Sequence, residues 1–125
     1  MRRRLTLSLL GLVVVAVTIV SSASASCIFL TAAQKRAQAD VIFNGVALEG
    51  PTATGVQRFR VLRYLKSRGP EVVRVNTGYV KRADGTGSIT SVSLIVKKGQ
   101  RWRIFATGSA RKVLQTNICV GSRRL

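Results

Sequence analysis

Short runs of β-branched and aromatic residues, separated by glycine and proline turns, fill the chain from residue 40 onward. Such runs with regularly spaced turn signals are typical of a small β-sandwich or barrel. Five strands are predicted, at residues 41–48, 57–65, 71–77, 91–97 and 101–107, and a sixth at 112–118. Loops at 50–55 and 67–70 and a tight turn at 98–100 join them. The pattern therefore predicts an all-β domain.

One short helix is expected before the first strand. Residues 31–39 (TAAQKRAQA) are rich in helix formers. Thr31 is placed to act as the N-cap, and Gln34, three residues later, completes a capping box. The predicted fold class is thus all-β with a short N-terminal helix.

Alternation along the strands predicts which side chains face the core. Phe105 is expected to share the outer side of its strand with Arg101 and Arg103. The opposite, buried sides of the predicted strands at 57–65 and 101–107 are expected to hold Phe59, Val61, Leu65, Trp102, Ile104 and Ala106. The polar loop at 81–90 (KRADGTGSIT) contains two glycines and is expected to be mobile and to face a partner.

The N-terminus has the three regions of a secretory signal peptide in order. Three arginines at 2–4 precede an apolar run at 5–20, and small residues follow at 21–26. Ala23 and Ala25 form the pattern that signal peptidase recognises, which predicts a signal peptide at 1–25 and a domain at 26–125. A cut after Ser26, an uncleaved membrane anchor and a lipid anchor on Cys27 are the alternatives. The protein is expected to be secreted.

The chain has two cysteines, Cys27 and Cys119. Export brings them to a compartment where thiols oxidise, so one intramolecular disulfide is expected. Closing a loop of some 90 residues is worth about 4 to 5 kcal/mol in the chain-entropy model. The bridge would tie the N-terminal end of the domain to its C-terminal end.

The chain is strongly basic, with 21 Lys and Arg against 4 Asp and Glu. The predicted signal peptide contains three of the arginines, so 18 basic and 4 acidic residues remain, a formal charge of +14. A domain with this charge attracts anions. Its cations alternate with apolar residues, as on the solvent side of strands. These cations either keep the protein soluble or bind it to an anionic surface. They are Arg58, Arg60, Arg63, Lys66, Arg74, Lys97, Lys98, Arg101 and Arg103.

The residue types needed for common catalytic sites are missing or scattered. There is no histidine, which excludes a Ser-His-Asp triad and a histidine metal site. The four carboxylates stand singly, and both cysteines are expected to be bridged. We therefore predict no catalytic residue, metal ligand or cofactor, and a protein that is not an enzyme. Nucleic-acid binding is disfavoured because Phe59 and Trp102 are assigned to the core and the protein is exported.

The order of segments resembles a known family, the tissue inhibitors of metalloproteinases and the related netrin-like modules. The match begins at Cys27 and continues with the strand ADVIFNGV at 39–46. It includes the segments 59–66 and 73–78, the hairpin KGQRWRIFA at 98–106 and the closing TNIC at 116–119. The resemblance implies an OB-fold, a five-stranded barrel.

The chain departs from this family at its N-terminus. The inhibitors begin with Cys-x-Cys, and the amine and carbonyl of the first cysteine chelate the zinc of the protease. Ala25 stands in that place here, and the usual partner cysteine in the loop at 83–88 is also absent. By resemblance, Cys27 and Cys119 would be the surviving bridge, whereas the chelating residue cannot be carried over.

The protein is expected to be a secreted, inhibitor-like binding module. It is expected to be a monomer. Its protein partner, such as a protease, would meet the N-terminal segment and the loops at 50–55 and 81–90. The alternative is an adhesion module that binds anionic cell-surface polymers or lipids through its basic strand faces. The candidate partner-binding residues are Ser26, Cys27, Ile28, Asp84, Gly85 and Thr86.

Overall fold

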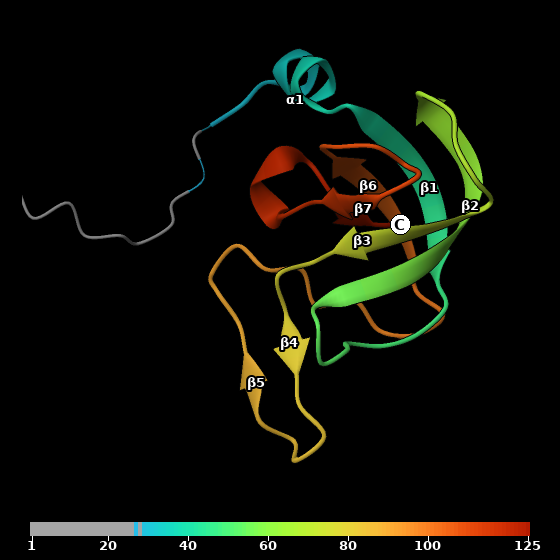
Figure 1. The fold of residues 1–125 in the computed structure, drawn as a ribbon. Helices are drawn as coiled ribbons and strands as arrows, with labels where there is room; N and C mark the ends of the chain where they lie inside the picture. The colour runs from blue at the N-terminus through green and yellow to red at the C-terminus, as the bar shows by residue number, and fades with distance from the viewer. Residues whose placement is uncertain (1–26, 28) are drawn as a thin grey trace, which may run out of the picture.

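The computed structural model describes residue 27 and residues 29–125, which form a curled β-sheet with one short helix (Figure 1). The predicted signal peptide at 1–25 lies outside the described residues. The helix is α1 (Ala32–Gln38), and a 3-10 turn, η1, spans Ile118–Val120. The strands are β1 (Val41–Ala47), β2 (Val56–Lys66), β3 (Val72–Asn76), β4 (Val80–Lys81), β5 (Gly87–Ser88), β6 (Arg101–Ala106), β7 (Val113–Gln115) and β8 (Arg123–Arg124).

The main sheet has six strands in the order β7-β3-β2-β1-β6-β8. β1, β2 and β3 form an antiparallel meander, and β1 also pairs with β6. β7 runs parallel to β3, and a bridge between Thr107 and Gln115 connects it to the end of β6. The sheet therefore curls into a half-barrel, while β4 and β5 form a separate hairpin that projects from it (Figure 1).

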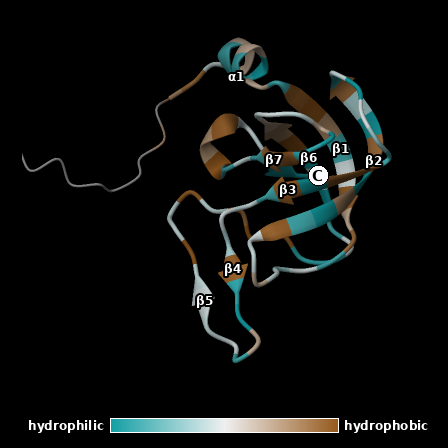
Figure 2. Ribbon diagram, viewed as in Figure 1, coloured by the Kyte–Doolittle hydropathy of each residue, from teal (hydrophilic) through white to brown (hydrophobic). Residues whose placement is uncertain are grey.

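The core fills the inside of this curled sheet. Hydrophobic and hydrophilic residues alternate along β2 and β3 (Figure 2), and Phe59 on β2 is fully buried. Phe43 on β1 packs edge to face on Phe59, with ring centroids 6.1 Å apart. The predictions for Phe59, Ile104 and Ala106 are confirmed, and Trp102 lies half-buried against the same core.

Helix α1 and its predicted capping box are confirmed. The Thr31 hydroxyl accepts from the Gln34 backbone N–H at 3.1 Å, and the Gln34 side chain accepts from the Thr31 N–H at 2.9 Å. The reciprocal bonds satisfy two N–H groups that the first helical turn would otherwise leave unpaired. Immediately after the helix, buried Ala39 leads the chain into β1.

The predicted burial of Leu65 is wrong, because two β-bulges interrupt the alternation in β2. Gly45 pairs with Val61 and Asn44 with Arg63, so Leu62 has no partner on β1. Phe43 pairs with Tyr64 and Ile42 with Lys66, which leaves Leu65 unpaired and 41% exposed. Each bulge inserts one extra residue and moves the following side chain to the other face.

The strand predicted at 91–97 is not formed. The segment runs without a β-ladder, although Leu94 and Val96 are fully buried in the core. Its backbone is held by single bonds, from the Leu94 N–H to the Thr77 carbonyl at 3.0 Å and from the Gln57 side chain to the Val96 carbonyl at 2.9 Å. Hydrophobic burial thus occurs here without strand pairing.

The strand predicted at 112–118 is shorter than expected and covers only β7. The Asn117 side chain accepts from the Cys119 N–H at 2.8 Å and caps η1, which ends the extended conformation. The two-residue strands β4, β5 and β8 were not predicted, since such short segments carry no alternation pattern. Among the described residues, none of the helices has the length and hydropathy needed to cross a membrane.

Candidate functional site

The outer face of the main sheet carries a row of arginines that crosses several strands. Asn44 on β1 pairs with Arg63 on β2 and with Arg103 on β6. Arg103 in turn pairs with Arg123 on β8. Because paired residues in an antiparallel sheet point to the same face, these side chains form one continuous row.

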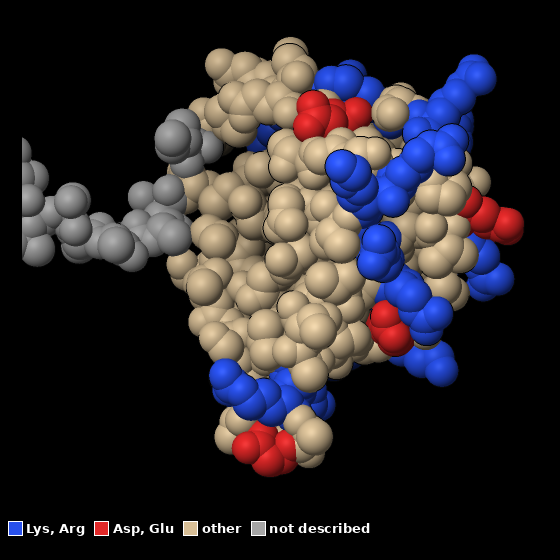
Figure 3. All heavy atoms as spheres, in the orientation of Figure 1, with Lys and Arg blue, Asp and Glu red and all other residues tan. Residues whose placement is uncertain are grey.

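More arginines extend this row toward the other end of the strands. Arg58 on β2 pairs with Arg74 on β3, and Val46 on β1 lies between Arg60 and Arg101. Basic side chains gather along the right side of Figure 3, where β1 and β2 lie in Figure 1. We define the basic face as Arg58, Arg60, Arg63, Arg74, Arg101, Arg103 and Arg123.

The positive charge of this face is largely uncompensated. Like charges directly opposite one another destabilise a sheet, and the pairs Arg58–Arg74 and Arg103–Arg123 both have this arrangement. Within the described residues, one salt bridge joins the Glu49 carboxylate to the Arg58 Nε at 3.3 Å. The hydrogen bond from Arg58 lowers the pKa of Glu49, so this carboxylate stays ionised. The remaining arginines create a positive electrostatic potential over this face.

Arg103 is held in place by a neighbouring side chain. Its Nε donates to the Asn44 Oδ1 at 2.9 Å, across the β1–β6 pair. The bond uses the inner nitrogen of the guanidinium and leaves the two terminal nitrogens free to donate. A guanidinium fixed in this way is suited to bidentate contact with a phosphate or a carboxylate.

A groove of about 740 Å³ adjoins the basic face, between helix α1 and the turn that contains η1. Ile42, Leu65, Phe105 and Ile118 supply its apolar lining. Lysines and arginines surround these residues, and no acidic residue in the described part of the chain lines the groove. The cations are Lys35, Arg36, Lys66, Arg103 and Arg123, so the groove shares Arg103 and Arg123 with the basic face.

The bulges of β2 create both surfaces. Strict alternation from Arg58 and Arg60 would point Tyr64 outward and Arg63 into the core. The extra residue at Leu62 instead sends Arg63 outward beside Asn44, and Tyr64 inward, where its ring lies 6.3 Å from that of Phe43. The second bulge returns Lys66 to the outer face, beside Ile42.

Hydrogen bonds fix the wall of the groove that is formed by the turn containing η1. The Ser122 hydroxyl accepts from the Phe105 N–H at 2.9 Å and lies 2.7 Å from the Thr116 hydroxyl. The Thr116 hydroxyl donates to the Phe105 carbonyl at 2.7 Å. The turn that carries Ile118 is therefore fastened to β6.

No family model, curated protein or solved structure matches this chain. The function is therefore inferred from the geometry of the basic face and the groove.

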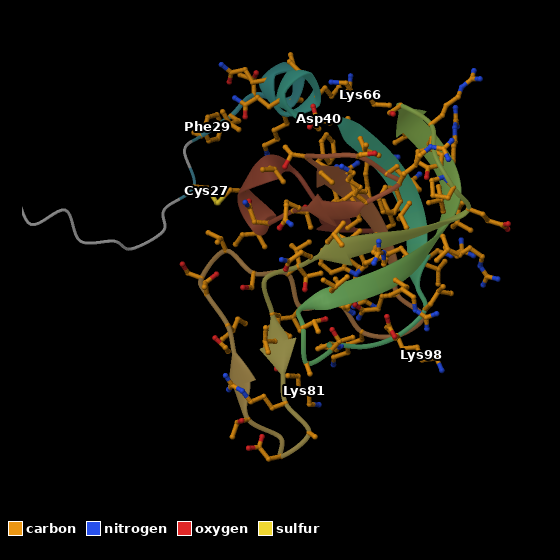
Figure 4. The ribbon with its side chains drawn as sticks, viewed as in Figure 1. Cys27, Phe29, Asp40, Lys66, Lys81 and Lys98 are labelled. Atoms are coloured by element: carbon orange, nitrogen blue, oxygen red, sulfur yellow. A yellow bond between two sulfur atoms is a disulfide. The ribbon has the colours of Figure 1, made fainter. Side chains whose placement is uncertain are left out.

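The predicted disulfide between Cys27 and Cys119 is present, with the two Cα atoms 5.0 Å apart. Cys27 lies beside η1, which places the start of the domain against its C-terminal turn (Figure 4). Because the Cys27 sulfur is bonded to Cys119, it cannot also form a thioether to a lipid. The disulfide and the lipid anchor on Cys27 therefore exclude each other. Ser26 and Ile28, the neighbouring candidate residues, lie outside the described part of the chain.

The other predicted partner-binding residues lie at the tip of the β4–β5 hairpin. Asp84, Gly85 and Thr86 are exposed, as is every residue of the loop at 81–90. The Thr86 N–H and hydroxyl donate to Asp84 Oδ1 at 2.9 and 2.6 Å, and these bonds lower the pKa of Asp84. The hairpin points away from Cys27 (Figures 1 and 4), so the structure does not bring these candidates together. Their role in partner binding stays a hypothesis.

Sequence reasoning identified most cations of the basic face but not the groove. Phe105 lies on the outer side of β6 with two arginines, as predicted. An aromatic residue on this side indicates that part of the outer surface is apolar. The sequence pattern does not predict that Lys35, Ile42 and Ile118 approach one another, because their approach depends on the packing of α1 and η1. The Cys, Asp and Glu residues that the structure describes form no cluster of three that could bind a metal ion.

Proposed function

We propose that this protein is an exported binding module that attaches to anionic surfaces or polymers through its basic face. The observation that carries this proposal is the cross-strand row in which Asn44 separates Arg63 from Arg103 and Arg103 pairs with Arg123. The sheet places these arginines in one row, one or two strands apart, so that a polyanion can contact several of them at once. The Cys27–Cys119 bridge is compatible with an extracellular location.

The proposed binding is mainly electrostatic, so it depends on salt. Exposed charges separated by more than about 8 to 10 Å are largely screened at physiological ionic strength. Binding to a polyanion should therefore weaken steeply as salt increases, whereas binding through a packed, apolar interface should change much less.

The test is a titration of the protein with long-chain polyphosphate at increasing salt, with the variant Arg63→Glu plus Arg123→Glu. We expect this variant to lose at least tenfold in affinity, because it reverses two charges in one row. The matched control is Arg82→Glu plus Lys98→Glu, which reverses two exposed charges outside the basic face. Equal losses in both variants would show that net charge alone drives binding and would contradict the proposal.

A second candidate function follows from the family resemblance, namely an inhibitor-like module that meets a protease through its N-terminal segment. The strand order supports the proposed OB-fold barrel, because a β1–β2–β3 meander, pairing of β1 with β6 and a parallel β3–β7 pair fit that topology. The bridge from Cys27 to Cys119 supports the proposed correspondence at the N-terminus.

The paired test of this second function uses two forms of the protein, one beginning at Ser26 and one at Cys27, against a panel of zinc endopeptidases. We expect the Ser26 form to inhibit poorly, because its amine lies one residue before the disulfide and loses more freedom on binding. Inhibition by that form at nanomolar concentration would contradict this expectation and favour the inhibitor function.

A further inference from the structure

We infer that the groove beside the basic face binds an amphiphile with an acidic headgroup and a single acyl chain. The inference rests on the proposed function, because it takes the anionic partner and specifies its chemistry. A volume of about 740 Å³ falls within the range of roughly 300 to 1,000 Å³ that is typical of small-molecule sites.

The apolar lining is suited to an acyl chain. Ile42 and Phe105 lie directly opposite each other on β1 and β6, and Ile42 also pairs with Lys66 on β2. Leu65 and Ile118 are 41% and 46% exposed, so two large aliphatic side chains border the groove with much of their surface in water. Covering them with an alkyl chain would remove apolar surface from water, which favours binding.

The backbone of β1 and β6, beneath Ile42 and Phe105, disfavours an extended peptide as the occupant. β1 lies between β2 and β6, and β6 lies between β1 and β8, so the ladders on both sides use their backbone groups. The Ser122 hydroxyl, which also lines the groove, is engaged by Phe105 and Thr116. A peptide bound across the strands would leave its own amides without partners, whereas an alkyl chain has none to satisfy.

The charges around the groove select an acidic headgroup. Five cations border it, and no carboxylate of the described residues lines it. Lys66 is already bonded to carbonyls of α1, with its Nζ 2.7 Å from the Arg36 oxygen. Arg103, oriented by Asn44, and Arg123 remain at the side shared with the basic face. The headgroup is therefore expected at Arg103 and Arg123, with the chain directed toward Ile118 and Leu65.

The experiment measures binding of monomeric lysophosphatidate with a 12-carbon chain by titration calorimetry. Glycerol 3-phosphate has the same headgroup without the chain, and monolaurin has the same chain without the charge. We expect both to bind at least tenfold more weakly than the lysophosphatidate. Equal binding of glycerol 3-phosphate would show that only the charges are used and would overturn the inference.

The variant that tests the lining is Leu65→Ser plus Ile118→Ser, which keeps the net charge. Its matched control is Ile89→Ser plus Ile95→Ser, which replaces two aliphatic residues that are 52% and 50% exposed away from the groove. We expect the groove variant to lose about tenfold or more in lysophosphatidate affinity and the control to stay within twofold. Both should retain the circular dichroism spectrum and the thermal midpoint of the parent.

Polyphosphate binding distinguishes failure of this inference from failure of the proposed function. If the groove variant binds both polyphosphate and lysophosphatidate like the parent, the inference is wrong and the proposed function stands. If the parent binds neither, both are wrong. Sedimentation shows whether the groove instead binds a second copy of the chain: a dimer that the groove variant abolishes would overturn the inference.

Discussion

Lys66, at the end of β2, reaches across the sheet to the last turn of helix α1. Its Nζ donates to the Arg36 carbonyl at 2.7 Å and to the Ala37 carbonyl at 3.4 Å. These carbonyls belong to the end of the helix that lacks intrahelical partners and carries a partial negative charge. The lysine thus connects α1 to the sheet and fixes one wall of the groove.

Replacement of this lysine tests the connection. Lys66→Met should reduce the free energy of unfolding by about 0.5 to 1 kcal/mol, because an exposed charge-assisted bond at a helix C-terminus is worth roughly that much. Chemical denaturation measures the loss. Lys112→Met, at an exposed lysine outside the groove, is the control and should leave stability unchanged within about 0.5 kcal/mol.

Gln57 is a polar side chain in the core, and its loss should be costly. Its Nε2 donates to the Glu49 carbonyl at 3.0 Å and to the Val96 carbonyl at 2.9 Å, whereas its Oε1 has no partner among the residues that the structure describes. Gln57→Leu should destabilise the protein by about 1 to 3 kcal/mol, because it leaves the buried Val96 carbonyl unsatisfied. Denaturation of this variant and of the exposed control Gln38→Leu measures the difference. An unchanged midpoint for Gln57→Leu would mean that removing the unpaired oxygen offsets the lost bonds.

Tyr64 should make the protein sensitive to alkaline pH. Burial raises the pKa of Tyr64, and its hydroxyl donates to the Pro70 carbonyl at 2.6 Å. The folded state therefore holds the proton more tightly than the unfolded state. The resulting stability is present below the unfolded pKa of about 10 and is lost as pH rises through the folded pKa.

The measurement is the free energy of unfolding from about pH 8 to about pH 11. Tyr64→Phe should be less stable than the parent at neutral pH, and its stability should fall less above about pH 10. Tyr79→Phe serves as the comparison and should keep the alkaline loss of the parent. If the parent and Tyr64→Phe lose stability in parallel, Tyr64 does not cause the alkaline loss.

The disulfide should contribute a large part of the stability. It joins residues 92 apart in sequence, and the chain-entropy model gives about 4.7 kcal/mol for a loop of roughly 100 residues, an upper figure for a real protein. Cys27→Ser plus Cys119→Ser should therefore unfold at a lower denaturant concentration. Reducing agent should lower the midpoint of the parent to that of the variant and leave the variant unchanged. Two alkylatable thiols in the native, unreduced parent would contradict the bridge itself.

Local sequence patterns determined the elements that depend on interactions between residues close in sequence. The Thr31 capping box predicted α1 because both of its bonds join residues three apart. Alternation predicted the inward positions of Phe59, Ile104 and Ala106, since neighbouring side chains of a strand point to opposite faces. The two cysteines, read directly from the sequence, predicted the bridge, and the cations that alternate with apolar residues predicted the basic outer side of the strands.

Tertiary pairing decided what alternation alone could not. The bulges at Leu62 and Leu65 exist only where β2 meets β1, and they reversed the predicted face of Leu65. The segment at 91–97 has strand-like alternation, but its Val96 carbonyl pairs with the Gln57 side chain, a contact between residues 39 apart. The groove likewise forms only when α1, β2, β6 and η1 meet. Long-range packing selects among the registers that a local pattern allows. The position of the groove was therefore decided by the folded sheet, whereas the cations that border it were evident from the sequence.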